Sequence, residues 1–287
     1  PAMTIITPAR GKIRLSPGQV RRPHAAPRHR TLPAAARAVL TSFAVREVAL
    51  VLFGYVAYFL VRGQTQGSHA QAVANSHKVV DLEKVAGFFW EPSIQDRIVD
   101  QQWIVNLANW MYIYGHWPLI AIVASWLLWK RRETFTLFRT AFFISGAVGV
   151  AVFVLFPVAP PRLAGIGVVD TVTLHSSAYR VLQPAAFTNQ YAAVPSLHFG
   201  WDLLIGLALV TNARWLVARI FGAVVPVLMF TAIVLTANHY IFDAIAGGAV
   251  ALTGLAAAYA LRAWGDRALQ PLRDLAAVRP PRQEPAT

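Results

Sequence analysis

Residues 215–243 read WLVARIFGAVVPVLMFTAIVLTANHYIFD, and this stretch decides the fold class. Its first part, residues 215–236, holds one charge, Arg219, and is long enough to cross the roughly 30 Å apolar core of a bilayer as a helix. It is followed at once by polar residues, among them His239 and Asp243. The sequence therefore predicts a membrane-spanning helix with ionisable side chains at one end.

The rest of the chain repeats this apolar pattern. Of its 287 residues, 56% are hydrophobic and only 14% are charged, against roughly 25% in an ordinary soluble domain. We expect an all-α polytopic membrane protein with six transmembrane helices, the second kinked at Pro118 and the short fourth extended at its ends. The lack of cysteine excludes disulfides and thiolate metal sites. The six apolar runs lie at 44–61, 103–129, 134–156, 197–211, 215–236 and 240–262.

The basic residues predict how these helices are oriented. The formal net charge is +13, but Lys and Arg gather at the ends of the apolar runs, which disfavours nucleic-acid binding. With both termini in the cytoplasm, 20 of the 26 basic residues lie inside and six outside. We therefore expect cytoplasmic termini. The abundance of Arg over Lys indicates a bacterial protein, so we expect an integral protein of the bacterial plasma membrane.

The apolar runs divide the chain into three parts. Residues 1–40, rich in Pro, Arg and Ala, are expected to form a disordered basic cytoplasmic tail. Residues 41–262 are expected to form the six-helix catalytic domain, and residues 263–287 a cytoplasmic C-terminal tail.

Two of the outer segments are long. Residues 75–100 are predicted to form an amphipathic helix at the membrane interface, with Phe88, Phe89 and Trp90 as its apolar side. Residues 157–196 form a loop rich in Pro and Gly, and we expect it to carry active-site residues.

Three polar segments are predicted to meet at the outer face. The third apolar run ends in FPVAPPR (156–162), the fourth begins with PSLH (195–198), and NHYIFD (238–243) joins the fifth to the sixth. If the last segment is helical, His239 and Asp243 share one face. A carboxylate that binds one ring nitrogen leaves the lone pair of the other available as a nucleophile or base.

Other polar residues could assist this pair. His198 lies at the matching depth and could protonate a leaving group, while the planar fork of Arg162 could hold a phosphate. Asp202, inside the fourth span, is expected either to orient His198 or to pair with a neighbouring helix for structural reasons. A zinc site at His198, His239 and Asp243 is a less favoured alternative.

These segments resemble the signature blocks of the type 2 phosphatidic acid phosphatase superfamily. They are most similar to its inositolphosphotransferase-like branch, which includes the fungal inositol phosphorylceramide synthases. The resemblance spans roughly residues 75–262 and rests chiefly on PSLH at 195–198 and NHYxxD at 238–243. Weaker matches lie at Asp81–Lys84, Gly87, Glu91 and Asn109–His116.

The resemblance implies catalysis through a phosphohistidine, with no metal or other cofactor. His239 would attack phosphorus, Asp243 would orient it, and His198 would protonate the departing oxygen. Candidates for binding the phosphate are Arg162, Ser196 and Asn238. Possible accessory residues are Asp202, His116, Tyr112, Asp170 and Tyr191.

The sequence departs from the superfamily pattern at two cationic positions. The Lys expected seven residues before Arg162 is replaced by Leu155, and Ala232 and Ile233 stand where Ser-Arg is expected before the last histidine. Two phosphate-binding positive charges are thus missing. We expect Arg180, Lys84 or Arg97 to supply the deficit.

The resemblance favours one function over two alternatives. It implies transfer of a phosphoryl or phospho-headgroup from a membrane lipid phosphate to an alcohol acceptor resembling inositol or a sugar. Hydrolysis of a lipid phosphate or diphosphate is the alternative within the same family. A non-catalytic transporter or scaffold is more remote, because the sequence shows no internal repeat. The oligomeric state is left open.

Overall fold

The computed structural model describes residues 42–64, 67–171 and 189–277, and its regular structure there is helical apart from one isolated parallel β-bridge. Five helical stretches are long and apolar enough to cross a membrane. The predicted all-α polytopic membrane protein is confirmed. The elements are α2 (Phe43–Gln64), α3 (His69–Ala86), α4 (Glu91–Asp96), α5 (Gln102–Trp110), η1 (Met111–Gly115), α6 (His116–Lys130), α7 (Arg132–Leu155), η2 (Pro161–Leu163), α10 (Leu197–Asn212), α11 (Leu216–Leu235) and α12 (Ile241–Ala277). The predicted tail at residues 1–40 lies outside the described residues.

The predicted fourth span, α10, is short and is not extended at its ends. It begins after Pro195, because the hydroxyl of Ser196 accepts the amide hydrogen of Phe199 and caps the helix. It ends at Asn212, after 16 residues. At 1.5 Å per residue it is about 24 Å long, less than the apolar thickness of a bilayer. The expected extension is therefore wrong.

The predicted last span continues well past residue 262. Helix α12 runs for 37 residues to Ala277, which corresponds to about 55 Å. The candidate membrane span within this helix covers Ile241–Gln270. Most of the predicted C-terminal tail thus continues the helix, while residues 278–287 lie outside the described residues.

The second span is irregular one turn before Pro118, where a kink was expected. A π-helical turn, Met111–Gly115, separates α5 from α6. Pro118 has no amide hydrogen to donate to a carbonyl of the preceding turn. The backbone there forms a wider π-helical turn instead of continuing as an α-helix. Such turns are frequent at functional sites, and this one carries Tyr112.

The single interfacial helix predicted over residues 75–100 is wrong. Helix α3 ends at Ala86 because Gly87 adopts a left-handed φ of 80°, and its amide returns to the carbonyls of the last turn. A second, short helix, α4, begins at Glu91. The predicted apolar side, Phe88–Trp90, therefore lies in the connection between two helices.

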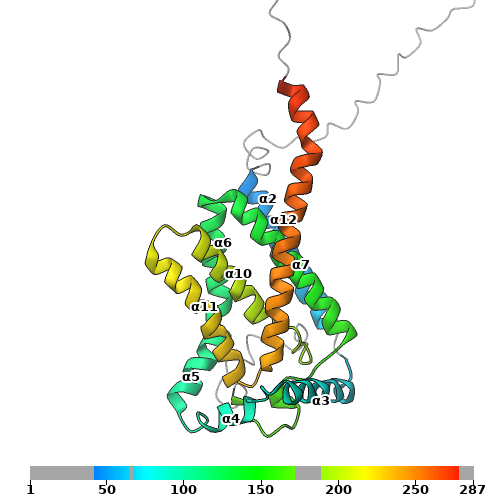
Figure 1. The fold of residues 1–287 in the computed structure, drawn as a ribbon, viewed down its shortest axis with the longest axis vertical. Coiled ribbons are helices and arrows are strands. Elements are labelled where there is room, and N and C mark those ends of the chain that lie inside the picture. Colours follow the sequence, from blue (N-terminus) through cyan, green and yellow to red (C-terminus); the bar gives the residue numbers. More distant parts are fainter. Residues whose placement is uncertain (1–41, 65–66, 172–188, 278–287) are drawn as a thin grey trace, which may run out of the picture. The chain divides into compact units, whose positions relative to one another are not determined.

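Helix α3 lies across the bundle at the end where α12 begins (Figure 1). The amide of Asn75 donates to the carbonyl of Pro157 at 2.9 Å, and the backbone amide of Ala159 donates to the carbonyl of Ala72 at 3.1 Å. These bonds join α3 to the loop that follows α7. Residues 172–188 of that loop lie outside the described residues.

The central helices approach one another closely at small residues. Helix α10 packs against both α11 and α12, and α7 packs against α12. A methyl group added to Gly247 of α12 would overlap the carbonyl of Ser196, directly before α10. This contact sets the spacing between the segments that carry His198 and His239.

We expect Gly247→Ala to destabilise the protein, because the added methyl group must push the start of α10 away from α12. The expected cost is about 1–3 kcal/mol in the free energy of unfolding, with a loss of activity. The measurement is the melting temperature of the purified protein. Gly265→Ala is the matched control in the same helix, since a methyl group there meets no atom within 4 Å. Equal melting temperatures of the two variants would contradict this account of the packing.

Candidate active site

A cavity of about 740 Å³ lies between α2, the π-turn, α6 and the start of α10. Its volume is in the range of small-molecule sites in proteins. Aromatic side chains form a large part of the cavity wall, and eight basic, imidazole or amide side chains also line it. These are Arg62, His116, Arg162, Asn189, Gln190, His198, Asn238 and His239.

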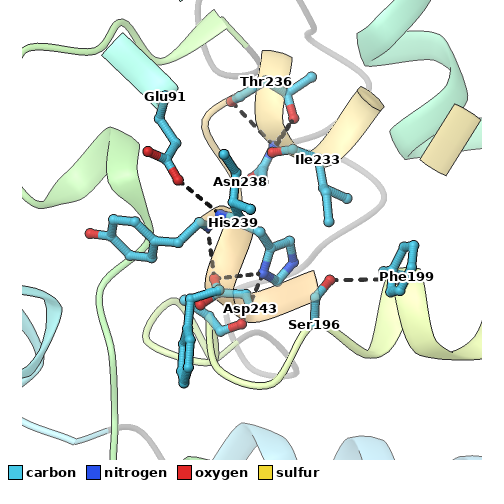
Figure 2. A network of polar contacts seen from close by, with 12 residues as sticks. Glu91, Ser196, Phe199, Ile233, Thr236, Asn238, His239 and Asp243 are labelled. Carbon is cyan, nitrogen blue, oxygen red and sulfur yellow. Dashed lines mark hydrogen bonds and ion pairs between the residues drawn. The ribbon is translucent and has the colours of Figure 1, made fainter. Parts of the chain in front are cut away.

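The ring of His239 is held through one of its nitrogens (Figure 2). Its Nδ1 lies 2.8 Å from the carbonyl oxygen of Ala193 and 3.2 Å from Oδ2 of Asp243. Both neighbours are acceptors, so Nδ1 carries the hydrogen and the lone pair resides on Nε2. The arrangement prepares Nε2 to act as a nucleophile or base at the cavity.

His239 and Asp243 meet by a different geometry from the predicted one. His239 precedes α12, and only Asp243 is in the helix. Its Oδ2 also accepts the amide hydrogen of Tyr240 at 2.9 Å, as an acidic residue in a capping box does. The carboxylate thus caps the helix and orients the imidazole with the same oxygen.

Two further carboxyl groups bind the start of α12. The carboxyl of Glu91 accepts the amide hydrogen of Ile241 at 2.8 Å, and that of Glu83 accepts the amide hydrogen of Phe242 at 2.7 Å. Figure 2 shows Glu91 reaching the chain beside His239. Three successive amides, from Tyr240 to Phe242, are therefore satisfied by three side chains from three elements. This arrangement suits the electropositive end of a helix.

The turn before His239 is fixed by backbone hydrogen bonds to the end of α11. The amides of Asn238 and His239 both donate to the carbonyl of Ile233, in the last turn of α11, at 3.1 and 3.2 Å. Between them and α11, Ala237 has a left-handed φ of 51°, which residues with a side chain rarely adopt. Its carbonyl accepts the amide hydrogen of Arg162 at 3.1 Å, which links this turn to the first predicted motif.

His198 is held by ring contacts. Its ring centroid lies 4.6 Å from that of Tyr112, in a stacked arrangement, and 4.6 Å from that of His116. The ring of His239 is 5.9 Å away. A phosphoryl group between His198 and His239 would therefore have an imidazole on each side.

Asp202 has a different partner from the predicted one. Its Oδ1 lies 2.8 Å from Nδ1 of His116, and both side chains are buried. The expectation that Asp202 orients His198 is therefore wrong, and the alternative of a partner on a neighbouring helix is the one observed. Asp202 and His198 are both on α10, but the carboxylate faces α6.

Arg162 is oriented by two polar contacts. Its Nε donates to the amide oxygen of Asn238 at 3.0 Å, and its Nη1 lies 3.1 Å from Oδ2 of Asp170. Both Arg162 and Asn238 line the cavity. Asp170 thus steadies the guanidinium from behind instead of lining the cavity itself.

The second cation at the cavity is Arg62, near the end of α2. Two of the three expected substitutes lie elsewhere, and the third is not among the described residues. Lys84 is exposed and lies over the ring of Phe89, Arg97 is exposed on the surface, and Arg180 lies outside the described residues. The sequence could have indicated Arg62, because it is a basic residue at the end of the first apolar run, on the side where the site was predicted.

Two other predicted residues lie beside the cavity and do not line it. Ser196 caps α10, and its amide is already bonded to the carbonyl of Asp243 at 2.9 Å. It therefore positions the start of α10, and its predicted role in binding phosphate receives no support. The hydroxyl of Tyr191 lies 3.3 Å from Nδ1 of His69, on α3.

The zinc alternative has no geometric support. Within the residues that the structure describes, no group of three or more His, Asp or Glu side chains is arranged to hold a metal ion. Asp243 instead directs its Oδ2 to the imidazole and to a backbone amide.

Comparison with known proteins gives two matches. A family model described as PAP2 superfamily matches residues 77–257, which is more than half of the chain. Phosphoinositol dihydroceramide synthase from Bacteroides thetaiotaomicron is 29% identical over 163 residues, which cover 49% of this chain and 52% of that protein. The chain thus spans about half the length of this relative. No solved structure matches the chain.

Because of the carboxyl group of Glu83, we expect the stability of the folded protein to depend on pH. Burial raises its pKa to about 9, aided by the nearby carboxyls of Glu91 and Asp243 and opposed by the hydrogen bond from Phe242. The folded protein therefore holds a proton that the unfolded chain releases near pH 4.5. The free energy of unfolding should fall as the pH rises between these two values.

We expect Glu83→Gln to remove this part of the pH dependence, because the amide oxygen can still accept the bond from Phe242 but carries no charge. Melting temperatures measured from pH 5 to 9 should decline less steeply than in the natural protein. Asp81→Asn, at an exposed position of the same helix, is the control and should leave the slope unchanged. Parallel curves for all three proteins would show that Glu83 is not the titrating group.

Proposed function

Since the chain belongs to the PAP2 superfamily, we propose that it moves a phosphoryl or phospho-headgroup from a membrane lipid phosphate to an alcohol, through a phosphohistidine at His239. It is an integral membrane enzyme of a superfamily of lipid phosphatases and phosphotransferases. The similarity to a protein named as a synthase supports the inositolphosphotransferase-like branch.

The observation that carries the mechanism is the pair of acceptors at Nδ1 of His239. Two acceptors hold its Nδ1, and its Nε2 is left for the cavity, where His198 and two arginines also lie. A nucleophile, an acid and cations in one cavity are the parts that phosphoryl transfer requires.

In the first step, the lone pair of His239 Nε2 attacks phosphorus. A nitrogen–phosphorus bond forms, the bond to the lipid alcohol breaks, and the departing oxygen takes a proton from His198. In the second step, an acceptor hydroxyl attacks phosphorus and the electron pair returns to Nε2. His198 takes the hydroxyl proton, so both histidines regain their starting states.

Two guanidinium groups would stabilise the charge on the phosphoryl oxygens. Arg162 is held in place by Asn238 and Asp170, so little reorganisation is needed when the charge develops. Arg62 supplies a second positive charge from α2. We propose that it compensates for the cations missing from the sequence motifs.

The acceptor distinguishes transfer from hydrolysis. Water in the second step would make the protein a lipid phosphatase, and the same histidines would serve. The relative named as a synthase favours an alcohol. A non-catalytic scaffold is disfavoured by the hydrogen-bonded His239 and Asp243.

We place the cavity at the outer face of a bacterial plasma membrane. The supporting observation is the distribution of charge, with 20 of 26 basic residues on the opposite side of the predicted spans. A lipid would then enter from the bilayer with its phosphate at the level of the headgroups.

His239→Ala should abolish turnover of lipid phosphates and the formation of a phosphoenzyme, since the nucleophile is gone. The measurement is incubation with a ³²P-labelled lipid phosphate, followed by detection of acid-labile label on the protein. His198→Ala should still become labelled when the leaving group needs no proton. Full activity of His239→Ala would refute the mechanism, and equal losses of His198→Ala on activated and ordinary substrates would remove its role as the acid.

Arg62→Gln should raise the KM for the lipid phosphate about tenfold, with a smaller change in kcat, because one phosphate-binding charge is lost. The comparison is Arg97→Gln, at an exposed position outside the cavity. Initial rates measured over a range of substrate concentrations in mixed micelles give both constants. A larger effect at Arg97 would favour the expectation from the sequence over the structural assignment.

A further inference from the structure

A second histidine–carboxylate pair lies at the wall of the cavity, with its histidine lining the cavity and its carboxylate buried behind. Nδ1 of His116 lies 2.8 Å from Oδ1 of Asp202, and the two residues are 1% and 0% exposed. A carboxylate at Nδ1 places the hydrogen there, so Nε2 of His116 is a hydrogen-bond acceptor. His116 lines the cavity, and the mechanism proposed above does not use it.

The position of His116 relates this pair to the alcohol that takes part in the reaction. The ring of His116 lies 4.6 Å from that of His198, whereas His239 lies 5.9 Å from His198. In the proposed function, on which this inference rests, His198 exchanges a proton with the oxygen that leaves or attacks. His116 therefore lies beside the alcohol that is exchanged.

The surroundings of the pair are apolar and aromatic. Trp117 packs edge-on against His116 with ring centroids 5.1 Å apart, and Trp201 lies parallel to it at 6.2 Å. Among the residues that the structure describes, Oδ2 of Asp202 has no hydrogen-bond partner. A buried carboxylate with a single partner is costly, and this one orients an imidazole at the wall of the cavity.

We propose that Nε2 of His116, oriented by Asp202, accepts a hydrogen bond from a second hydroxyl of the exchanging alcohol, next to the reacting oxygen. A cyclic polyol carries such a hydroxyl, and so does the head of a dihydroceramide. Water and simple long-chain alcohols do not. The pair would thus select a multiply hydroxylated alcohol over water, so that transfer is favoured over hydrolysis.

The test compares two substitutions of similar size. His116→Gln keeps an acceptor oxygen close to the position of Nε2, and His116→Met does not. The full-length protein receives labelled phosphatidylinositol together with dihydroceramide, free myo-inositol, hexadecanol or no added alcohol. The readout is the ratio of transfer to hydrolysis within each reaction, which is independent of how much enzyme is folded. His77→Met, an exposed histidine of α3, is the control.

We expect His116→Met to lower this ratio about tenfold with the acceptor that the pair recognises, as for the loss of one buried hydrogen bond. His116→Gln should retain most of the ratio, and hexadecanol should be a poor acceptor for every variant. The acceptor with which the ratio falls shows whether the recognised hydroxyl belongs to the polyol or to the dihydroceramide. An unchanged ratio in His116→Met, or hexadecanol as good an acceptor as the others in the natural protein, would overturn the proposal. Labelling of His239→Ala would instead refute the proposed function itself.

Discussion

Three carboxyl groups from three different elements converge on the first turn of α12, where the aligned peptide dipoles make the helix end electropositive. Glu83 comes from α3, Glu91 from α4 and Asp243 from α12 itself. Their bonds to the consecutive backbone amides of Tyr240, Ile241 and Phe242 fix the chain directly after His239. The same bonds attach α3 and α4 to the membrane helices. The position of the nucleophile and the attachment of the outer segment therefore depend on one set of interactions.

The start of α10 is fixed against this same turn. The amide of Ser196 donates to the carbonyl of Asp243, and Gly247 lets the two backbones touch. Backbone contacts between two helix starts thus set the spacing of the segments that carry His198 and His239. The cavity between them can remain in shape when no ligand is bound, as transition-state stabilisation by fixed groups requires.

Much of this arrangement could be predicted from the sequence. Apolar runs of sufficient length gave the spans, and Arg162, His198 and His239 do line one cavity. Gly87 could have indicated the end of α3, because a glycine after a helical pattern commonly ends the helix. The break between α3 and α4 was missed because the acidic and apolar residues on either side suit a continuous helix.

The partners of buried polar groups could not be predicted in this way. Asp202 is one helical turn from His198, yet it faces His116 on another span. The rotation of α10 about its axis determines this partner, and the spacing in the sequence does not. Arg62 reaches the cavity because α2 packs beside α7. Such pairings depend on the relative orientation of helices that are distant in the chain, and local patterns do not encode this orientation.

The π-turn at Met111–Gly115 has a consequence for how this chain can change. A π-turn accommodates one residue more than an α-turn, so it acts as a single-residue insertion in the helix. It thereby determines which way every later side chain of the span points around the helix axis. Deleting one residue there would restore an unbroken helix, but it would rotate α6 about its axis by roughly a quarter-turn or more. The imidazole of His116 would then turn away from Asp202. An insertion or deletion in this segment is thus far more disruptive than most substitutions, although the turn is only one short irregularity in a long apolar span.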